Sequence, residues 1–481
     1  MNSYFRKIMP YLSSFLLLLL VYFSLPVDAV KRLPFGDVTI FEYFGYAMSR
    51  GDTLYINMFD HKGPVIFLIN YIGYSIAGKL GIKLVYVLSI FLFIYFTYKI
   101  TTIFDKNNSY YIFVQVIVII IFLNVFELGF GLEGYMLPFI TYSFYIYLDY
   151  FINGYYSKLR LMALGFSFAV VMFTKLNMVG LWFILSIGVI VSLLFKKEYK
   201  QIFVLSIYFI IGLLIFVIPI LVYLYNKSAL YAMYYQSIII NFKYSGLQGI
   251  GLKETINWLF LTLNQFSLIF IAIAGSILMY LKNKKKYLTM LLVMMFIFCL
   301  SMTVISKRNY LHYLIVIIPL FIPYIYIVVE SLGEKLNKIV LSIIMFFAII
   351  LLYYPQISNI NDNIKNREIN NAKSYEIIAE YIKNNTERTD RIYSHQLQGV
   401  VYLLSDRLSS TKYFFIPSLQ ENIGLITNDF KENFEKNLPK IIVTDKKYLS
   451  GTRIDEYIVE KINEKYEIVK VEKDLIVYKL K

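Results

Sequence analysis

The sequence is poor in cysteine, tryptophan and charge. Only 16% of its 481 residues are Asp, Glu, Lys or Arg, whereas 58% are hydrophobic. Soluble domains carry about 25% charged residues, so this composition excludes an ordinary cytosolic enzyme. The single cysteine, Cys299, lies inside an apolar run, which excludes an internal disulfide and a cysteine-based metal site. The cysteine content therefore does not indicate whether the protein works in an oxidising or a reducing compartment.

The charged residues that are present are mostly basic. Lys and Arg number 47 against 32 acidic residues, which gives a net charge of +15. The lysines gather in short loops between apolar runs, where basic residues set the orientation of a membrane protein. We therefore expect membrane lipids as partners and no nucleic acid.

Long apolar runs recur from residue 9 to residue 354. A run of about 20 apolar residues can cross the hydrocarbon core as a helix. The sequence predicts an α-helical polytopic membrane protein with about eleven transmembrane helices. The expected spans are 10–27, 82–101, 110–126, 135–152, 161–176, 178–195, 202–225, 257–281, 288–305, 311–329 and 339–354.

Basic loops fix the expected orientation, with the N-terminus in the cytoplasm and the chain's C-terminal part outside. The residues on the inner side are Lys106, Lys158, Arg160, Lys196, Lys197, Lys200, Lys282, Lys284, Lys285, Lys286, Lys335 and Lys338. Lys31 and Arg32 oppose the rule, but they lie in a long outer segment, 28–81, where the rule is weak. Small residues near Ala29 leave a cleaved signal peptide as the rival interpretation of the first span.

The composition changes abruptly near residue 361, where Asn, Lys, Glu and Asp become frequent. We expect a membrane domain over 1–360 and an extracytoplasmic α/β domain over 361–481. The absence of a glycine-rich phosphate loop argues against nucleotide binding there. The expected helices are 371–385, 399–405, 418–437 and 453–464, and the expected strands are 391–394, 411–416, 440–444 and two runs ending at Leu480.

The first outer segment carries an amphipathic pattern that begins at Asp37. Apolar and small residues at helical spacing predict a helix lying in the membrane interface, with Gly51 at its end. Those residues are Phe41, Phe44, Gly45 and Met48. Asp37 can cap the helix, which stabilises it by about 1 kcal/mol. A carboxylate at the bilayer surface can also accept a proton from a sugar hydroxyl.

Asp60, His61 and Lys62 stand together just before Gly63-Pro64. The lysine ammonium can hold a phosphate as a point charge. The alternative is a solvated turn, with Pro64 at the first position of the following helix.

Three further outer segments carry charge. Glu127 and Glu133 stand on either side of glycines between two spans, where the negative charge of one of them can stabilise the N-terminus of the following helix. Lys175 lies between two apolar runs and must find an anion or reach the interface. Lys307, Arg308 and His312 form a cationic rim, which snorkelling lysine and arginine side chains also explain. If these segments converge, they place acids and bases around one cavity at the outer leaflet.

The pattern resembles the bacterial GT-C membrane glycosyltransferases, a group similar to the aminoarabinose transferases and protein O-mannosyltransferases. The first outer loop carries the most specific part of the match, and the later motifs follow in the same order. The matching residues are Asp37, Phe41, Tyr43, Gly51, Tyr55, Phe59 to Pro64, Glu133, Pro138, Thr174, Lys175, Arg308, Tyr310, His312, Tyr313 and Pro319, with a weaker match in the tail at Asp390 to Tyr393 and Val401 to Leu403.

The resemblance implies a role for each of these charged residues. Asp37 would be the general base, and Lys62, Arg308, His312 and Lys175 would bind the donor phosphate. The remaining residues would orient the acceptor or a metal, namely Glu133, Asp60 and His61. No cofactor is certain and a divalent cation stays open, although Val38 stands where metal-dependent relatives often have a second acid.

The implied function is transfer of a monosaccharide, with inversion, from a polyprenyl-phosphate donor to a glycan, lipid or protein of the cell envelope. It would take place at the outer face of the bacterial plasma membrane. The alternatives are a polymerase or ligase of lipid-linked glycans, a flippase or transporter, and a non-catalytic envelope binding protein. A transporter favours charges near the bilayer midplane and repeated halves, whereas here the charges lie near the ends of spans and we find no internal repeat.

Overall fold

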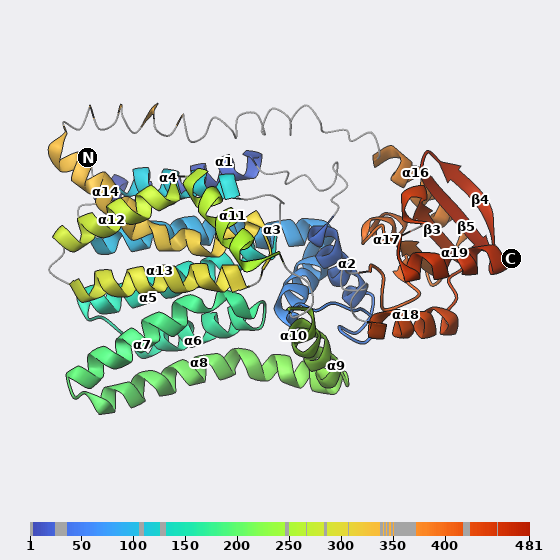
Figure 1. The fold of residues 1–481 in the computed structure, drawn as a ribbon, viewed down its shortest axis with the longest axis horizontal. Coiled ribbons are helices and arrows are strands. Elements are labelled where there is room, and N and C mark those ends of the chain that lie inside the picture. The colour runs from blue at the N-terminus through green and yellow to red at the C-terminus, as the bar shows by residue number, and fades with distance from the viewer. Residues whose placement is uncertain are drawn as a thin grey trace. The chain divides into compact units, whose positions relative to one another are not determined.

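The computed structural model describes most of the chain and divides it into two compact units (Figure 1). The described ranges are 3–24, 36–104, 110–125, 131–245, 250–265, 267–282, 286–305, 307–336, 372–416, 424–449 and 451–481, with single residues between 340 and 350. The first unit comprises Met1–Val27, Tyr86–Leu221 and Gly249–Asn363. The second comprises Asp28–Val85, Val222–Gln248 and Ile364–Lys481. The first outer segment thus groups with the C-terminal part of the chain.

The first unit consists of apolar helices. They are α1 (Ser3–Ser24), α3 (Pro64–Phe104) from Tyr86 on, α4 (Tyr111–Val125), α5 (Leu132–Asn153), α6 (Lys158–Met172), α7 (Gly180–Phe195), α8 (Tyr199–Asn226) up to Leu221, α11 (Leu252–Gln265), α12 (Leu268–Lys282), α13 (Lys286–Ile305) and α14 (Ile322–Lys335). Two 3-10 helices, Leu176–Met178 and Leu311–Phe321, complete it. Most predicted spans correspond to one of these helices.

The expected count of eleven spans is not confirmed. Among the described residues, four helices are long and apolar enough to cross a membrane, or five if the bent pair α11 and α12 forms one span. Several apolar runs fold as shorter or broken helices, and the run at 311–329 begins as a 3-10 helix that contains Pro319. The expected span 339–354 falls largely outside the described residues. The chain is a multi-pass membrane protein.

In the second unit, α3 is bent into two arms. Ala77 and Gly78 leave the helical conformation, with Gly78 at φ 57°. The arms then approach so closely that a Cβ atom added at Gly81 would lie 1.8 Å from the carbonyl oxygen of Gly73. Only glycine permits this approach. Pro64 stands at the first position of α3, as the solvated-turn alternative expected.

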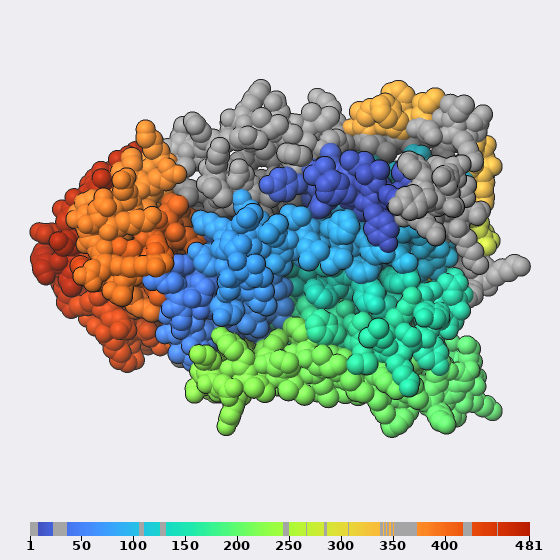
Figure 2. Space-filling view, turned by 180° about the vertical axis from the view of Figure 1, so that it is seen from behind, coloured from blue at the N-terminus to red at the C-terminus, as the bar shows by residue number. Residues whose placement is uncertain are grey.

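Helix α2 (Asp37–Ser49) forms where the sequence predicts a helix, but it does not lie open in an interface. Every residue from Thr39 to Met48 is buried. Phe44 stacks on Phe67 of α3 with ring centroids 4.0 Å apart, and Tyr43 packs on Phe414 of the C-terminal domain at 4.1 Å. The amphipathic pattern describes one face, but α2 is covered on several sides, since Phe44 also meets Phe414 and Tyr46 meets Tyr74 of α3. Figure 2 shows the orange C-terminal residues adjoining the blue residues of this segment.

The C-terminal domain is an α/β domain, as predicted. Its sheet has the strand order β2-β1-β3-β5-β4, in which β2, β1 and β3 are parallel and β5 and β4 antiparallel. The strands are β1 (Arg391–His395), β2 (Leu408–Ser409), β3 (Ile441–Asp445), β4 (Tyr466–Glu472) and β5 (Leu475–Leu480). The helices are α16 (Ala372–Asn385), α17 (Val400–Ser405), α18 (Gly424–Lys436) and α19 (Arg453–Lys465), with a 3-10 helix at Lys446–Tyr448.

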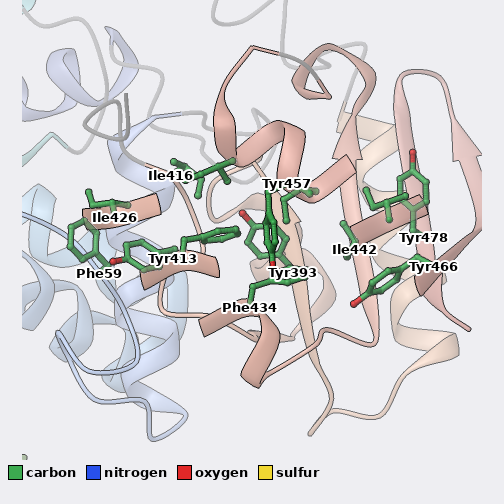
Figure 3. Close-up of a cluster of buried hydrophobic side chains, with 14 of the residues drawn as sticks. Phe59, Tyr393, Tyr413, Ile416, Ile426, Phe434, Ile442, Tyr457, Tyr466 and Tyr478 are labelled. Atoms are coloured by element: carbon green, nitrogen blue, oxygen red, sulfur yellow. The ribbon is translucent and has the colours of Figure 1, made fainter. Parts of the chain in front are cut away.

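One predicted strand is wrong. Residues 411–416 form no strand, and the short strand β2 lies just before them. Four successive side chains, from Tyr413 to Ile416, are all buried, so the run lacks the alternation of inward and outward side chains that a strand at a surface shows. They follow an irregular path because they fill the space between the first outer segment, which includes α2, and the core of the C-terminal domain. Figure 3 shows Phe59 of the first outer segment beside Tyr413 in this core.

We predict that Gly81→Ala destabilises the protein. The added methyl group would meet a backbone oxygen that cannot move aside, and overpacking of this kind costs up to about 3 kcal/mol. Gly251→Ala is the matched control, because its nearest neighbour would lie 3.6 Å from the new Cβ. The midpoint of thermal unfolding in detergent should fall for Gly81→Ala alone. Equal midpoints would contradict the close approach of the two arms.

Candidate active site

The start of α2 presents Asp37 to solvent. The N-cap position belongs to Gly36, at φ 101°, which has no side chain to cap the helix. Asp37 is therefore the first residue inside the helix rather than the cap that the simpler interpretation of the sequence favoured. Its side chain is 53% exposed, and its Oδ2 atom lies 3.5 Å from Nζ of Lys62. A helix N-terminus also favours negative charge.

Lys62 lies between two carboxylates, one fully buried and the other half-exposed. Nζ is 3.6 Å from Oδ1 of Asp60, whose side chain is fully buried, and 3.5 Å from the half-exposed Asp37. The same Asp60 oxygen accepts the backbone N–H of Lys62 at 2.9 Å. The ring of Phe41 lies 5.2 Å from Nζ on another side. These contacts hold the ammonium group at the start of α2, so the expected pairing of an acid with an amine is present.

The loop that carries Asp60 and Lys62 is held by Gln236. This glutamine lies in a π-helical turn, Tyr235–Ile239, between α9 (Leu230–Tyr234) and α10 (Ile240–Ser245). Its amide donates to the carbonyl oxygen of Tyr55 at 2.7 Å and accepts from the backbone N–H of Asp60 at 3.3 Å. The loop backbone is thereby fixed from outside the first outer segment.

Asn241 and Tyr55 complete this support. Asn241 donates to the carbonyl oxygen of His61 at 2.6 Å, and the Tyr55 hydroxyl donates to that of Lys62 at 2.8 Å. Burial raises the pKa of Tyr55 well above its ordinary value, and the nearby Asp60 carboxylate raises it further. The hydroxyl therefore stays protonated and remains a donor. Tyr55 holds a left-handed backbone conformation, with φ 66°.

The sequence prediction missed Gln236 and Asn241. Neutral amides carry no charge signal, and residues 226–256 lie between two expected spans without a clear periodicity. In the structure Gln236 is buried and Asn241 half-buried, whereas Tyr231 and Phe242 are 75% and 71% exposed, and nothing in the sequence separates these two sets.

A second cluster lies in the first unit, around Glu133 and Lys175. Glu133 is buried in the first turn of α5, and its Oε1 atom accepts a hydrogen bond from Nζ of Lys175 at 3.2 Å. The same ammonium group lies 3.6 Å from the ring centroid of Tyr313. Lys175 thus has the anion that its position between two apolar runs demands. The other acid of that loop, Glu127, lies outside the described residues.

The cationic rim is only half-buried and includes stacked rings. His312 stacks on Tyr310 with centroids 5.3 Å apart and meets Tyr313 edge-on at 5.0 Å. Arg308 is partly buried just before them. Tyr313 thus joins His312 to Lys175 and Glu133 within one unit.

The described acids of these clusters form no assembled ligand set for a divalent cation. Within the described ranges, no three acidic, histidine or cysteine side chains come together as ligands. The Lys62 ammonium, not an open position, lies between Asp37 and Asp60. His61 Nδ1 lies 3.6 Å from Oδ1 of Asp60.

The fold, apolar helices followed in the chain by an α/β domain, is shared with solved structures. The chain is similar to ArnT from Cupriavidus metallidurans bound to undecaprenyl phosphate, with a TM-score of 0.67, 13% identity and coverage of 97% of each chain. It is also similar to that protein in the apo state, with a TM-score of 0.66, 12% identity and coverage of 99% and 98%. No family model and no curated protein matches the sequence. The structural likeness confirms the fold that the resemblance implies.

We predict that Gln236→Leu destabilises the loop that carries Lys62. The substitution leaves the N–H of Asp60 and the carbonyl of Tyr55 buried without their partner, and each such loss costs about 1 to 3 kcal/mol. Ser237→Ala serves as the control, because its hydroxyl bonds only to Met233. The thermal unfolding midpoint should fall for Gln236→Leu and stay close to wild type for the control. The reverse order would show that Gln236 does not support the loop.

Proposed function

We propose that this protein is a membrane glycosyltransferase that moves a monosaccharide from a polyprenyl-phosphate donor to an acceptor of the cell envelope. Transfer takes place at the outer face of the bacterial plasma membrane, with the N-terminus in the cytoplasm and the C-terminal domain outside. The proposal rests on one observation above all. An exposed carboxylate, Asp37, lies 3.5 Å from a lysine held by a buried acid, in a fold shared with a protein solved with undecaprenyl phosphate.

In the proposed reaction, Asp37 accepts the proton of an acceptor hydroxyl. The hydroxyl oxygen then forms a bond to the anomeric carbon of the donor sugar, while the bond from that carbon to the phosphate oxygen breaks. Polyprenyl phosphate leaves with the bonding electrons, and direct displacement inverts the anomeric carbon. General base catalysis of this kind accelerates a reaction by about 10²- to 10⁴-fold.

Lys62 is proposed to neutralise the charge that develops on the leaving phosphate. An ammonium group has three donors, so it can retain a carboxylate partner while it binds a phosphate oxygen. Asp60 is fully buried and contacts Lys62 directly, so we propose that it positions Lys62 rather than touching the acceptor. His61 is half-buried beside it and remains a candidate for acceptor contact.

The residues of the first unit receive supporting roles in the proposal. Lys175, Arg308 and His312 are proposed as further phosphate-binding residues, and Glu133 as a residue that orients the acceptor. The pairing of Lys175 with Glu133 supports roles that depend on each other, since loss of either leaves the other charge without its partner.

The proposal is tested with the purified protein in lipid and a panel of polyprenyl-phosphate monosaccharides. Release of free polyprenyl phosphate in the presence of envelope glycans, lipids or proteins is the measured quantity. Consumption of at least one donor, dependent on an acceptor, is the expected result. Failure of every donor with every acceptor would overturn the proposal.

We predict that Asp37→Asn lowers kcat by about 10²- to 10⁴-fold while donor binding is retained, because the amide cannot accept the proton. The matched control is Asp474→Asn, whose side chain is 75% exposed in the C-terminal domain. The control should turn over donor like the wild type. Turnover of Asp37→Asn at the wild-type rate would remove Asp37 from the reaction, even if the protein proved to be a transferase.

A further inference from the structure

The N-cap residue of α2, Gly36, has no side chain, and a residue of the C-terminal domain holds this end of the helix. The backbone N–H of Gly36 donates a hydrogen bond to Oε1 of Gln398, which lies 362 residues further along the chain. The hydroxyl group of Thr39, in the first turn, lies 3.3 Å from the same oxygen. One amide oxygen therefore contacts the backbone on one side of Asp37 and a side chain on the other.

The loop that carries Gln398 is built for close approach to this helix. Gln396 and Gln398 both have left-handed backbone conformations, with φ of 59° and 52°. A Cβ atom at Gly399 would lie 2.3 Å from the carbonyl oxygen of Thr39 and 3.0 Å from Cβ of Tyr43. The loop thus meets α2 in direct backbone contact, which a larger residue at 399 would prevent.

The position of the loop in the sheet has a physical meaning. It connects β1 to α17 at the carboxyl end of β1, and β1 lies between β2 and β3 in the parallel part of the sheet. In open α/β sheets, ligands bind at the carboxyl ends of the strands, where the strand order reverses. Here the loop at that edge contacts a segment of the same chain, the start of α2.

Contacts further along α2 fix its remaining length to the same domain. Tyr43 accepts the backbone N–H of Ser409 at 2.8 Å, and Asp406 accepts hydrogen bonds from Tyr46 and Arg50, both at 3.0 Å. Immediately after the helix, Asp52 forms two hydrogen bonds with the guanidinium of Arg391, at 2.6 and 3.3 Å. The helix therefore has little freedom to shift along the domain surface, and Gln398 holds the one end that carries Asp37.

We propose that Gln398 is a positioning residue for Asp37, and that the C-terminal domain is thereby part of the catalytic unit rather than an accessory. This inference rests on the proposed function. It assigns Gln398 no contact with substrate. Its effect passes through the backbone of Gly36 and the first turn of α2, and Gly399 provides the space for that contact.

The experiment compares Gln398→Leu with Gln396→Leu in the full-length protein in lipid. Gln396 is the matched control, because it lies in the same loop with the same backbone conformation and no hydrogen bond from it to α2 is found among the described residues. Two quantities are measured: steady-state kcat and donor KM, and hydrogen–deuterium exchange of peptides that cover Gly36 to Phe41.

For Gln398→Leu we expect kcat to fall by about 10- to 100-fold with donor KM within about twofold, since small misplacements of a reacting group have effects of this size. Exchange at the start of α2 should accelerate by about tenfold, while α16 and α19 remain protected. Gln398→Glu retains an acceptor oxygen and should restore the protection. Gln396→Leu should match the wild type in both quantities.

The two proposals fail in different ways. A wild-type protein that consumes no donor ends the proposed function, whereas the exchange data still test the anchor. An active Gln398→Leu with unchanged kcat overturns the positioning role, whatever its exchange rate. If Gln398→Leu loses protection throughout, Gly399→Ala offers an independent displacement of α2, and wild-type kcat and exchange in that variant would equally overturn the inference.

Discussion

A carboxylate without access to water, that of Asp60, is the constraint on which the first outer segment depends. A buried charge is tolerated only when it is paired and hydrogen-bonded. Oδ1 of Asp60 meets this condition through the backbone N–H and the ammonium group of Lys62, whereas the buried Oδ2 has no hydrogen-bond partner among the described residues. The N–H of Asp60 is held by Gln236. Lys62 therefore holds its position because its N–H and ammonium group replace the water that the buried Asp60 carboxylate lacks. The lysine is held in place before any substrate arrives, which limits the entropy lost on binding.

Much of the fold follows from local patterns in the sequence. In the C-terminal domain, alternating apolar residues and helical periodicity locate α16, β1, α17, β3 and α19 to within a residue or two. The prediction failed at 411–416, because a continuous buried run is compatible with either a strand or an irregular segment enclosed on several sides. The number of spans could not be settled from apolar runs alone, because bends such as that at Gly78 depend on close packing between arms.

The candidate site, like the fold, has one part that the sequence predicts and another that it does not. Asp60, His61 and Lys62 are adjacent in the chain, so their concentration of charge at an apolar boundary is visible in the sequence. The partners Gln236 and Gln398 are 176 and 362 residues away from the groups they hold. They are neutral amides, whose importance arises only from the backbone groups they meet. A pattern search that weighs charge and periodicity has no means of finding them.

The use of a distant glutamine has a chemical reason. A capping aspartate accepts a hydrogen bond from a backbone N–H with one carboxylate oxygen, and an oxygen that already accepts this bond is a poorer proton acceptor. At the start of α2 the N-cap is Gly36, which has no side chain, and the order of this terminus comes instead from Gln398. Asp37 lies in the first turn of this anchored helix, and its carboxylate is half-exposed beside Lys62. In the proposed mechanism Gln398 anchors the helix and Asp37 is the base, so the same short segment is both rigid and chemically available.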